Sequence, residues 1–378
     1  MVLEGQQVAE SEEETEIEAQ VETQTQAEET GGDSVFVLVL KPDLSAIDLD
    51  EPLMTRICGV SMLDCVKRAV KGFEHKFVDV KEGDDITSLI REHGNESKWT
   101  IVLYADTPLL TKETLENVFD QAIANKIQAG RLPRGWIFET KTVLSGADIE
   151  IDELAVPNKE DFFVVNGLSR LERATRMMQA RINERHLENG VKIANSGATY
   201  IEAGVEIARS AVIEPNCTIK GDTVIKKGAT ILAGTYIESS VIEENAVLGP
   251  YARIRPKTTI GEDVKIGNFV EIKNSQISNG TKIAHMTYVG DAVIGEGCNI
   301  GCGVVFCNFD GKTKSKITLG DKVFVGSNSN LVAPLTLATN SYVAAGSTIT
   351  QDLEEDALGI ARARQVIKEN WRAEEGEE

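Results

Sequence analysis

The chain has 378 residues, of which 42% are hydrophobic, and a formal net charge of −21. This length allows two or three domains with ordinary cores that need no disulfide bonds. The acidic balance argues against nucleic acid as a partner, because a phosphate backbone selects a basic surface. The sequence has no apolar run of about eighteen residues and no basic, hydrophobic signal at its N-terminus. It therefore predicts neither membrane insertion nor secretion.

The N-terminal segment carries much of this charge. Residues 1–33 contain ten Glu, one Asp and no Lys or Arg, which leaves −10 for the rest of the chain. So little apolar surface cannot offset the entropy of ordering, so the segment is predicted to be a disordered acidic tail. A solubilising extension is favoured, with partner binding as the alternative. The six cysteines lack the spacing of a disulfide scaffold, which favours a reducing, cytoplasmic compartment.

Residues 34–166 are predicted to form a small α/β domain with a parallel sheet. "SVFVLVL" and "WTIVLYAD" are typical of buried strands, and "SMLDCVKRAVKGF" and "TKETLENVFDQAIANKI" are typical of helices. Thr111 is placed to cap the second helix, and Glu113 lies in its first turn. Ligands of such sheets bind at the carboxyl ends of the strands, where "YADTPLL" lies.

Residues 167–190 are predicted to form a helix that links this domain to the next. Leu171, Ala174, Met178 and Ile182 share one face, and Gly190 is expected to end the helix.

Residues 191–352 carry an internal repeat of six residues. Aliphatic side chains recur from Ile201 to Ile349, mostly at intervals of six with three intervals of five, among small residues. This period fits neither an amphipathic helix nor an alternating strand. It predicts roughly eight triangular coils of short strands that stack in parallel about 4.8 Å apart. The hand of the coil does not follow from the period.

Two segments depart from the repeat. Between Phe306 and Leu319, "CNFDGKTKSKIT" cannot lie flat in a coil, so we expect an extruded loop carrying Lys312, Lys314 and Lys316. Within residues 353–378, "GIARARQVIKENWRAEE" predicts a short helix that caps the open end of the coils.

Polar side chains inside the repeat require an explanation, because the coils bury aliphatic residues. Arg255 and Lys273 are 18 residues apart, which places them one coil apart on the same face, suited to an anionic group. His285 follows 12 residues later and falls on another face. A site that uses all three needs neighbouring chains, which fits a symmetric trimer. The other histidines lie outside the repeat, so a zinc site with several histidine ligands is not expected. Cys298, Cys302 and Cys307 are interpreted as buried structural thiols.

From about Gly167 to Trp371 the chain resembles the bifunctional UDP-N-acetylglucosamine pyrophosphorylase / glucosamine-1-phosphate N-acetyltransferase family of hexapeptide-repeat acyltransferases. The matching stretches are "LSRLER", "GPYARIRP", "GNFVEIK", "HMTYVGDAVIG", "CNFDG", "VFVGSNSNLVAP" and "AAGSTIT". The resemblance implies a left-handed parallel β-helix that transfers an acetyl group from acetyl-CoA to glucosamine 1-phosphate. It also implies a cytoplasmic homotrimer.

The resemblance assigns roles to individual residues. It implies that His285 is the general base, which suits an imidazole with an ordinary pKa near 6.5. The implied sugar-phosphate contacts are Arg255, Lys273, Tyr288, Asn299 and Lys314. The implied acetyl-CoA contacts are Cys302, Asn308, Phe309, Ser327, Ala345 and Arg362. Cys302 and Phe309 depart from the family's usual alanine and tyrosine.

The resemblance weakens in residues 34–166. The family has a glycine-rich phosphate loop after the first strand, but this chain has no glycine between Gly32 and Gly59. Asp106 falls on a magnesium-binding aspartate, and Asn166 matches a second magnesium position. We expect a shortened, degenerate nucleotidyltransferase-like domain without uridylyltransferase activity, and Mg²⁺ as a cofactor only if that domain is active. A structural or regulatory role and a retained ligand site are alternatives.

Two other functions stay open. The acceptor could be another amino sugar, for example a nucleotide-linked one, or the chain could be a non-catalytic scaffold. Direct transfer of the acetyl group is favoured over a route through Cys302 or Cys307, because the sequence shows no activating base for a thiol.

Overall fold

The computed structural model describes residues 34–45, 47, 51–146, 150–369, 371 and 372. The acidic segment 1–33 lies outside these residues. The chain divides into two compact units. The α/β unit comprises the described residues up to Ile57 and those from Ser61 to Ala174, and the β-helix unit comprises Cys58–Val60 and the described residues from Thr175 onward. The division falls inside the helix that was expected to link the two domains.

The α/β unit is built on one mixed sheet, with the strand order β4-β1-β5-β7-β6-β8. Its strands are β1 (Val35–Lys41), β4 (Glu74–Asp79), β5 (Trp99–Tyr104), β6 (Ala129–Leu132), β7 (Gly135–Glu139) and β8 (Asp152–Glu153). Its helices are α2 (Met62–Ala69), α3 (Ile86–His93), α4 (Lys112–Ala124) and α5 (Thr140–Ser145), with 3₁₀ turns η1 (Pro52–Met54) and η2 (Lys159–Phe162). The short strands β2 (Arg56–Ile57) and β3 (Val60–Ser61) pair with each other.

The expectation of a parallel sheet is right for half of this unit. Strands β4, β1 and β5 are parallel, and Thr111 caps α4 by accepting a hydrogen bond from the backbone N–H of Thr114 at 3.1 Å. Strand β7, however, runs antiparallel to both β5 and β6. The physical reason is the connection of only Pro133 and Arg134 between β6 and β7, because so short a turn can join antiparallel strands only.

The helix α6 (Leu168–Glu188) ends two residues before Gly190, which adopts φ +86°. Of its predicted apolar face, Ala174 and Ile182 are buried, whereas Leu171 and Met178 are half-buried.

The part of α6 that belongs to the β-helix unit closes the first coil. The Asn183 amide donates to the carbonyls of Ser196 and Thr199 at 2.7 and 2.9 Å. The carbonyl of Cys58 accepts from the backbone N–H of Ala203 at 3.0 Å. This end of the prism is therefore covered by residues that the sequence pattern did not single out, next to the 3₁₀ turn η3 (Ser196–Ala198).

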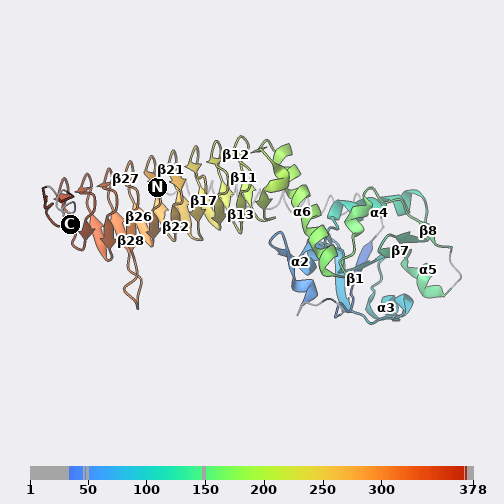
Figure 1. Cartoon of the computed structure of the whole chain (residues 1–378). Coiled ribbons are helices and arrows are strands. Elements are labelled where there is room, and N and C mark those ends of the chain that lie inside the picture. Colours follow the sequence, from blue (N-terminus) through green and yellow to red (C-terminus); the bar gives the residue numbers. More distant parts are fainter. Residues whose placement is uncertain (1–33, 46, 48–50, 147–149, 370, 373–378) are drawn as a thin grey trace, which may run out of the picture. The chain divides into compact units, whose positions relative to one another are not determined.

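The β-helix unit is a left-handed parallel β-helix with three faces, which we call sheets 1, 2 and 3 (Figure 1). Sheet 1 contains β10 (Tyr200–Ile201), β13 (Thr218–Lys220), β16 (Tyr236–Glu238), β19 (Arg253–Ile254), β22 (Glu271–Lys273), β25 (Tyr288–Gly290), β28 (Val305–Cys307), β31 (Asn330–Val332) and β34 (Thr348–Ile349). Sheet 2 contains β11 (Glu206–Ile207), β14 (Val224–Ile225), β17 (Ser240–Ile242), β20 (Thr258–Ile260), β23 (Gln276–Ile277), β26 (Ala292–Ile294), β29 (Ile317–Leu319) and β32 (Leu335–Leu337). Sheet 3 contains β9 (Lys192–Ile193), β12 (Val212–Ile213), β15 (Thr230–Ile231), β18 (Val247–Leu248), β21 (Lys265–Asn268), β24 (Lys282–His285), β27 (Asn299–Ile300), β30 (Phe324–Val325), β33 (Tyr342–Val343) and β35 (Leu358–Gly359).

The aliphatic series forms the core of the prism. Ile254 pairs with Ile272 in sheet 1, Ile260 with Ile277 in sheet 2, and both pairs are almost fully buried. The five-residue steps and the extruded loop all fall where the chain passes from sheet 1 to sheet 2, for example between Ile272 and Ile277. One corner of the prism therefore absorbs every irregularity of the repeat, and the loop projects from it (Figure 1).

The described part of the C-terminal segment does not form the expected helix, which corrects that prediction for these residues. Residues 353–369 contain no helix, and β35 instead adds a strand to sheet 3 by pairing Leu358 with Tyr342. A short isolated helix is marginal in water, whereas a further coil gives this segment hydrogen-bond partners in the sheet. Among the described residues, no helix is long and apolar enough to cross a membrane.

Candidate functional site

His285 ends β24, where the chain leaves sheet 3 for sheet 1; we call this corner of the prism the histidine corner. The His285 side chain is exposed, and its Nδ1 lies 2.8 Å from the Oδ1 of Asn268, its partner in the adjacent coil. An amide oxygen only accepts hydrogen bonds, so it selects the tautomer with the proton on Nδ1. The lone pair of Nε2 is then free to take a proton from a ligand.

A second set of polar groups lies where the chain leaves sheet 1 for sheet 2; we call this the lysine corner. Arg255 and Lys273 lie one coil apart at this end of sheet 1, as predicted, since the backbone N–H of Arg255 donates to the carbonyl of Ile272 at 2.8 Å. The nearby Lys314 side chain lowers the pKa of Lys273, and loss of water contact and the charge of Arg255 add to this effect. Arg255 also forms an ion pair with Glu271, with 2.8 Å between Nη1 and Oε1. Lys273 and Lys314 therefore supply most of the positive charge that favours an anionic ligand here.

Tyr288 and Asn308 complete the lysine corner. Gly290 lacks the side chain that would collide with the Tyr288 hydroxyl and the Asn308 amide, so both groups can lie above its backbone. Asp291 accepts hydrogen bonds from the amides of Asn274 and Asn308. Asn308 is buried, so this carboxylate fixes it in place beside Tyr288.

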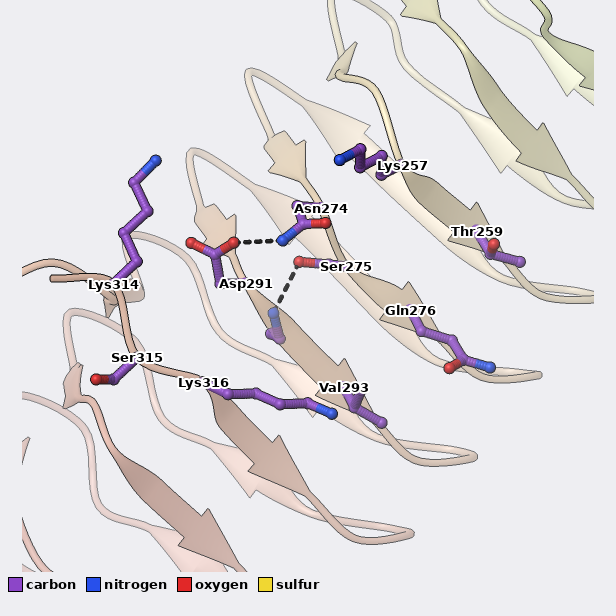
Figure 2. A pocket seen from close by; sticks show the side chains of 11 residues that line it. Lys257, Thr259, Asn274, Ser275, Gln276, Asp291, Val293, Lys314, Ser315 and Lys316 are labelled. Atoms are coloured by element: carbon purple, nitrogen blue, oxygen red, sulfur yellow. Dashed lines mark hydrogen bonds between the residues drawn. The ribbon is translucent and has the colours of Figure 1, made fainter.

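A hollow of about 560 Å³ lies on the sheet 2 side of the lysine corner. Figure 2 shows Lys257, Lys314 and Lys316 at this hollow, with the hydrogen-bonded pair Asn274–Asp291 between them. The extruded loop, which the interruption of the repeat predicted, supplies two of these lysines. Phe309, which forms a bridge with Lys314 in this loop, is exposed.

The histidine corner continues as a ladder of backbone contacts, one coil at a time. The carbonyl of His285 accepts from Gly303 at 3.4 Å, that of Cys302 from Asn328 at 2.8 Å, and that of Ser327 from Gly346 at 2.9 Å. The carbonyl of Ala345 accepts from the Arg362 guanidinium at 3.0 Å. Cys302, Ser327, Ala345 and Arg362 therefore line one edge of the prism below His285.

A single chain does not bring all the predicted site residues together. Sheet 1 lies between the histidine corner and the lysine corner, so His285 is separated from Lys273. Asn299 lies in sheet 3 with His285, away from the other implied sugar-phosphate residues. Asn308 and Phe309 lie at the lysine corner, away from the other implied acetyl-CoA contacts. Both implied sets are thus divided between the two corners.

The expectation of buried thiols holds for one of the three cysteines. Cys298 is buried, but Cys302 and Cys307 are partly exposed, because they lie beyond the inward-facing position of their hexads. Burial raises the pKa of both Cys298 and Cys307, which keeps these thiols protonated.

In the α/β unit, Asp106 lies two residues after the end of β5, at the expected carboxyl end of a strand. The backbone N–H of Val165 donates to the Asp106 carbonyl at 2.8 Å, which brings Asn166 into the same region. The Asp106 carboxylate, however, accepts from Nε and Nη2 of Arg134 at 3.2 and 2.6 Å. Among the described residues, no group of three or more His, Cys, Asp or Glu could hold a metal ion. Arg134 thus occupies the carboxylate that the resemblance implies as a magnesium ligand.

Sequence reasoning missed Asn268, Asp291 and Arg134. Asn268 lies 17 residues before His285, almost one coil, and that spacing could have identified it as the partner. Asp291 likewise lies 17 residues before Asn308. Arg134 could not be found from spacing, because it reaches Asp106 through a hairpin.

A prism of hexapeptide coils with polar corners defines the class of hexapeptide-repeat β-helix proteins. Residues 236–334 match the family model described as the GMPPB C-terminal domain. The chain is 45% identical over 250 residues to the Bifunctional protein GlmU of Clostridium acetobutylicum, covering 62% of this chain and 55% of that relative. It is 34% identical over 364 residues to the Bifunctional protein GlmU of Clostridioides difficile, covering 75% of this chain and 79% of that relative.

The match to the Clostridioides difficile protein extends over most of both chains. The chain therefore belongs to the family of the Bifunctional protein GlmU. It spans only about half the length of other relatives, such as 55% of the Clostridium acetobutylicum protein and 51% of that of Caldanaerobacter subterraneus. Among solved structures, LpxA from Acinetobacter baumannii is 16% identical with a TM-score of 0.41, covering 45% of this chain and 71% of that chain.

Proposed function

We propose that the protein transfers the acetyl group of acetyl-CoA to the amine of glucosamine 1-phosphate. The observation that carries this proposal is the exposed His285, whose Nδ1 faces Asn268, so that the neutral imidazole has its lone pair on Nε2. A scaffold protein has no use for an imidazole held in one tautomer beside an open surface. The cations Arg255, Lys273 and Lys314 supply a charge that fits the sugar phosphate.

The proposed reaction is direct transfer. His285 Nε2 removes a proton from the sugar ammonium, and the neutral amine then attacks the thioester carbonyl carbon. The carbon–nitrogen bond forms first and gives a tetrahedral intermediate. The carbon–sulfur bond breaks when this intermediate collapses, and a second proton from the nitrogen goes to the departing thiolate. Backbone N–H groups or side-chain donors steady the oxyanion of the intermediate. The products are the acetamide and free coenzyme A, and the proton on His285 returns to solvent.

The ladder below His285 suits the coenzyme. Cys302, Ser327 and Ala345 follow one another at about 4.8 Å per coil, so they form an extended edge beside which a linear chain can lie. Ser327 and Ala345 are exposed small residues, which leave room for that chain. Arg362 at the far end offers a cation to the phosphates of the coenzyme.

The site is completed between copies of the chain. In this proposal, one subunit of a cytoplasmic homotrimer contributes His285, Asn299 and the ladder, and the next contributes Lys273 and the lysine corner. This arrangement accounts for the division of both ligand-binding sets between two corners. Sheet 1 prevents one chain from supplying both corners to one small sugar.

We also propose that the α/β unit has lost uridylyltransferase activity. The glycine-poor segment after β1 and the ion pair at Asp106 support this proposal, because a nucleoside triphosphate needs backbone N–H groups and a cation around its phosphates.

The experiment is a thiol-release assay with acetyl-CoA and glucosamine 1-phosphate, run on the wild type and on His285→Ala. We expect release by the wild type and a loss of about 10²–10⁴-fold in kcat/KM for the variant, the usual contribution of a general base. The matched control is His75→Ala, which changes a histidine of the α/β unit and should leave the rate unchanged. Absence of release by the wild type would contradict this acceptor, and a panel of other amino sugars would then separate a different acceptor from a scaffold.

A further inference from the structure

The Asp106 carboxylate is fully engaged inside the α/β unit. Its side chain is 2% exposed, and the Arg134 guanidinium reaches it through two nitrogens, at 3.2 Å from Nε and 2.6 Å from Nη2. Such a two-point contact between a planar guanidinium and a carboxylate is the strongest geometry for this ion pair. A metal ion would have to replace that contact before it could bind either oxygen.

The backbone and a neighbouring ring hold Arg134 in this position. Strands β5 and β7 pair Leu103 with Gly135, which sets Arg134 beside the end of β5. The guanidinium carbon lies 3.9 Å from the centre of the Tyr104 ring, a distance typical of a cation stacked on an aromatic face. The connection from β6 to β7 contains only Pro133 and Arg134, which limits how far this side chain can move away.

Two features of the surroundings act against a magnesium–nucleoside triphosphate, the first on the cation and the second on the polyphosphate. Arg170 is a further cation whose charge acts on Asp106. A hollow of about 790 Å³ lies at the carboxyl ends of the strands. Its charged lining residues are the acids Asp43, Glu82 and Asp84 and the bases Lys81 and Arg134. Since Arg134 is already paired with Asp106, the remaining lining is net negative. A polyphosphate without its own counter-ions is repelled there.

We infer that Arg134 takes the place of the divalent cation next to Asp106, so that the α/β unit is a metal-independent module that does not bind a magnesium–nucleoside triphosphate. An arginine remains charged at every pH the protein meets, so it neutralises Asp106 permanently. The inference goes beyond the proposed acetyltransferase activity and does not depend on it.

The test counts Mn²⁺ ions bound to the full chain by electron paramagnetic resonance, with and without UTP. The wild type and Asp106→Asn should bind the same number of Mn²⁺ ions. The glutamates of residues 1–33 contribute equally to both proteins and cancel in the comparison. If Asp106→Asn binds one ion fewer than the wild type, the inference is overturned.

A second variant keeps the test decisive if Asp106→Asn does not fold. Arg134→Gln retains hydrogen-bonding groups but removes the charge, so we expect one additional Mn²⁺ ion per chain relative to the wild type. Arg131→Gln, at an exposed position of β6, is the matched control and should add no ion. The opposite result is a wild type that binds the same number of Mn²⁺ ions as Arg134→Gln and holds one of them tightly. That result would show that Arg134 does not replace the metal.

Discussion

The two units differ in how their charged side chains are paired. In the α/β unit, Asp106 is buried and forms two hydrogen bonds with Arg134, so both carboxylate oxygens and two guanidinium nitrogens are already engaged. In the β-helix unit, Lys273 lies beside Lys314, and this neighbour lowers the pKa of Lys273. A fold does not gain stability from two adjacent ammonium groups, so their proximity indicates a role in binding. Among these groups, the paired charges of Asp106 and Arg134 stabilise the fold, whereas the two adjacent ammonium groups mark the candidate site.

Exposure separates the histidines of the β-helix unit in the same way. His285 is exposed, and only its Nδ1 is engaged by Asn268. His186 on α6 is 5% exposed, and its Nε2 has no hydrogen-bond partner in the described part of the chain. The first can exchange protons with a ligand, whereas the second is held neutral by burial. The contrast predicts that substitution of His285 affects catalysis and substitution of His186 affects stability.

The largest expected effect tests whether His285 of one chain and Lys273 of another form one site. Differently tagged His285→Ala and Lys273→Ala chains are co-expressed, and assemblies that carry both tags are purified. In a cyclic trimer with both kinds of chain, exactly one of the three interfaces joins an intact His285 to an intact Lys273. We therefore expect about a third of the wild-type thiol-release rate from the mixed assemblies, although each variant alone is almost inactive.

Two controls define the result of this mixing experiment. Assemblies of two differently tagged His285→Ala chains should stay inactive, because no interface then contains an intact base. Mixed His285→Ala and Lys273→Ala assemblies that show no recovery would mean that one chain supplies both residues, which contradicts the shared site.

A smaller effect is expected at Cys302, the thiol of the histidine corner. Direct transfer needs no nucleophile from the protein, so Cys302→Ala should change kcat/KM by less than about twofold; a route through a thiol ester would lose several orders of magnitude. Alanine is the residue that the family usually carries here, so the substitution fits the available space. Rapid-quench analysis for a protein-bound acetyl group gives an independent readout. An acetylated wild type whose label disappears in Cys302→Ala would contradict direct transfer.

Much of the β-helix could be predicted, because its period is local. Each hexad places one aliphatic residue inward, so the spacing from Ile201 to Ile349 specifies the coils without knowledge of any long-range contact. The same spacing placed Arg255 above Lys273 and put His285 on another face. The six-residue spacing was therefore enough to predict both the fold of this unit and the arrangement of Arg255, Lys273 and His285.

The remaining features depend on contacts between distant segments. Arg134 reaches Asp106 only because β7 pairs antiparallel with β5, and a parallel sheet was expected. The C-terminal segment has helix-forming residues, but pairing of Leu358 with Tyr342 overrides that local preference. Residues 58–60, which belong to the β-helix unit, lie far from it in sequence. Local patterns contain no information on such pairings.

The smallest expected effect concerns His186 and the pH dependence of stability. Burial lowers the pKa of His186, and the charge of Arg185 lowers it further. The unfolded chain then binds a proton more readily than the folded chain, so the free energy of unfolding falls as the pH drops below the ordinary histidine value of about 6.5. Above that pH, both states carry a neutral imidazole and the contribution is constant. Replacing His186 with a residue that does not titrate should remove this part of the slope.

Urea unfolding of the wild type and of His186→Leu at pH 5, 6, 7 and 8 measures that slope. The variant differs in packing at every pH, so only the change in its unfolding free energy between pH 7 and pH 5 is compared with that of the wild type. His75→Gln, at an exposed site, is the matched control and should keep the wild-type slope. Equal slopes for the wild type and His186→Leu would mean that His186 has the same pKa folded and unfolded. Burial would then not be the property that separates it from His285.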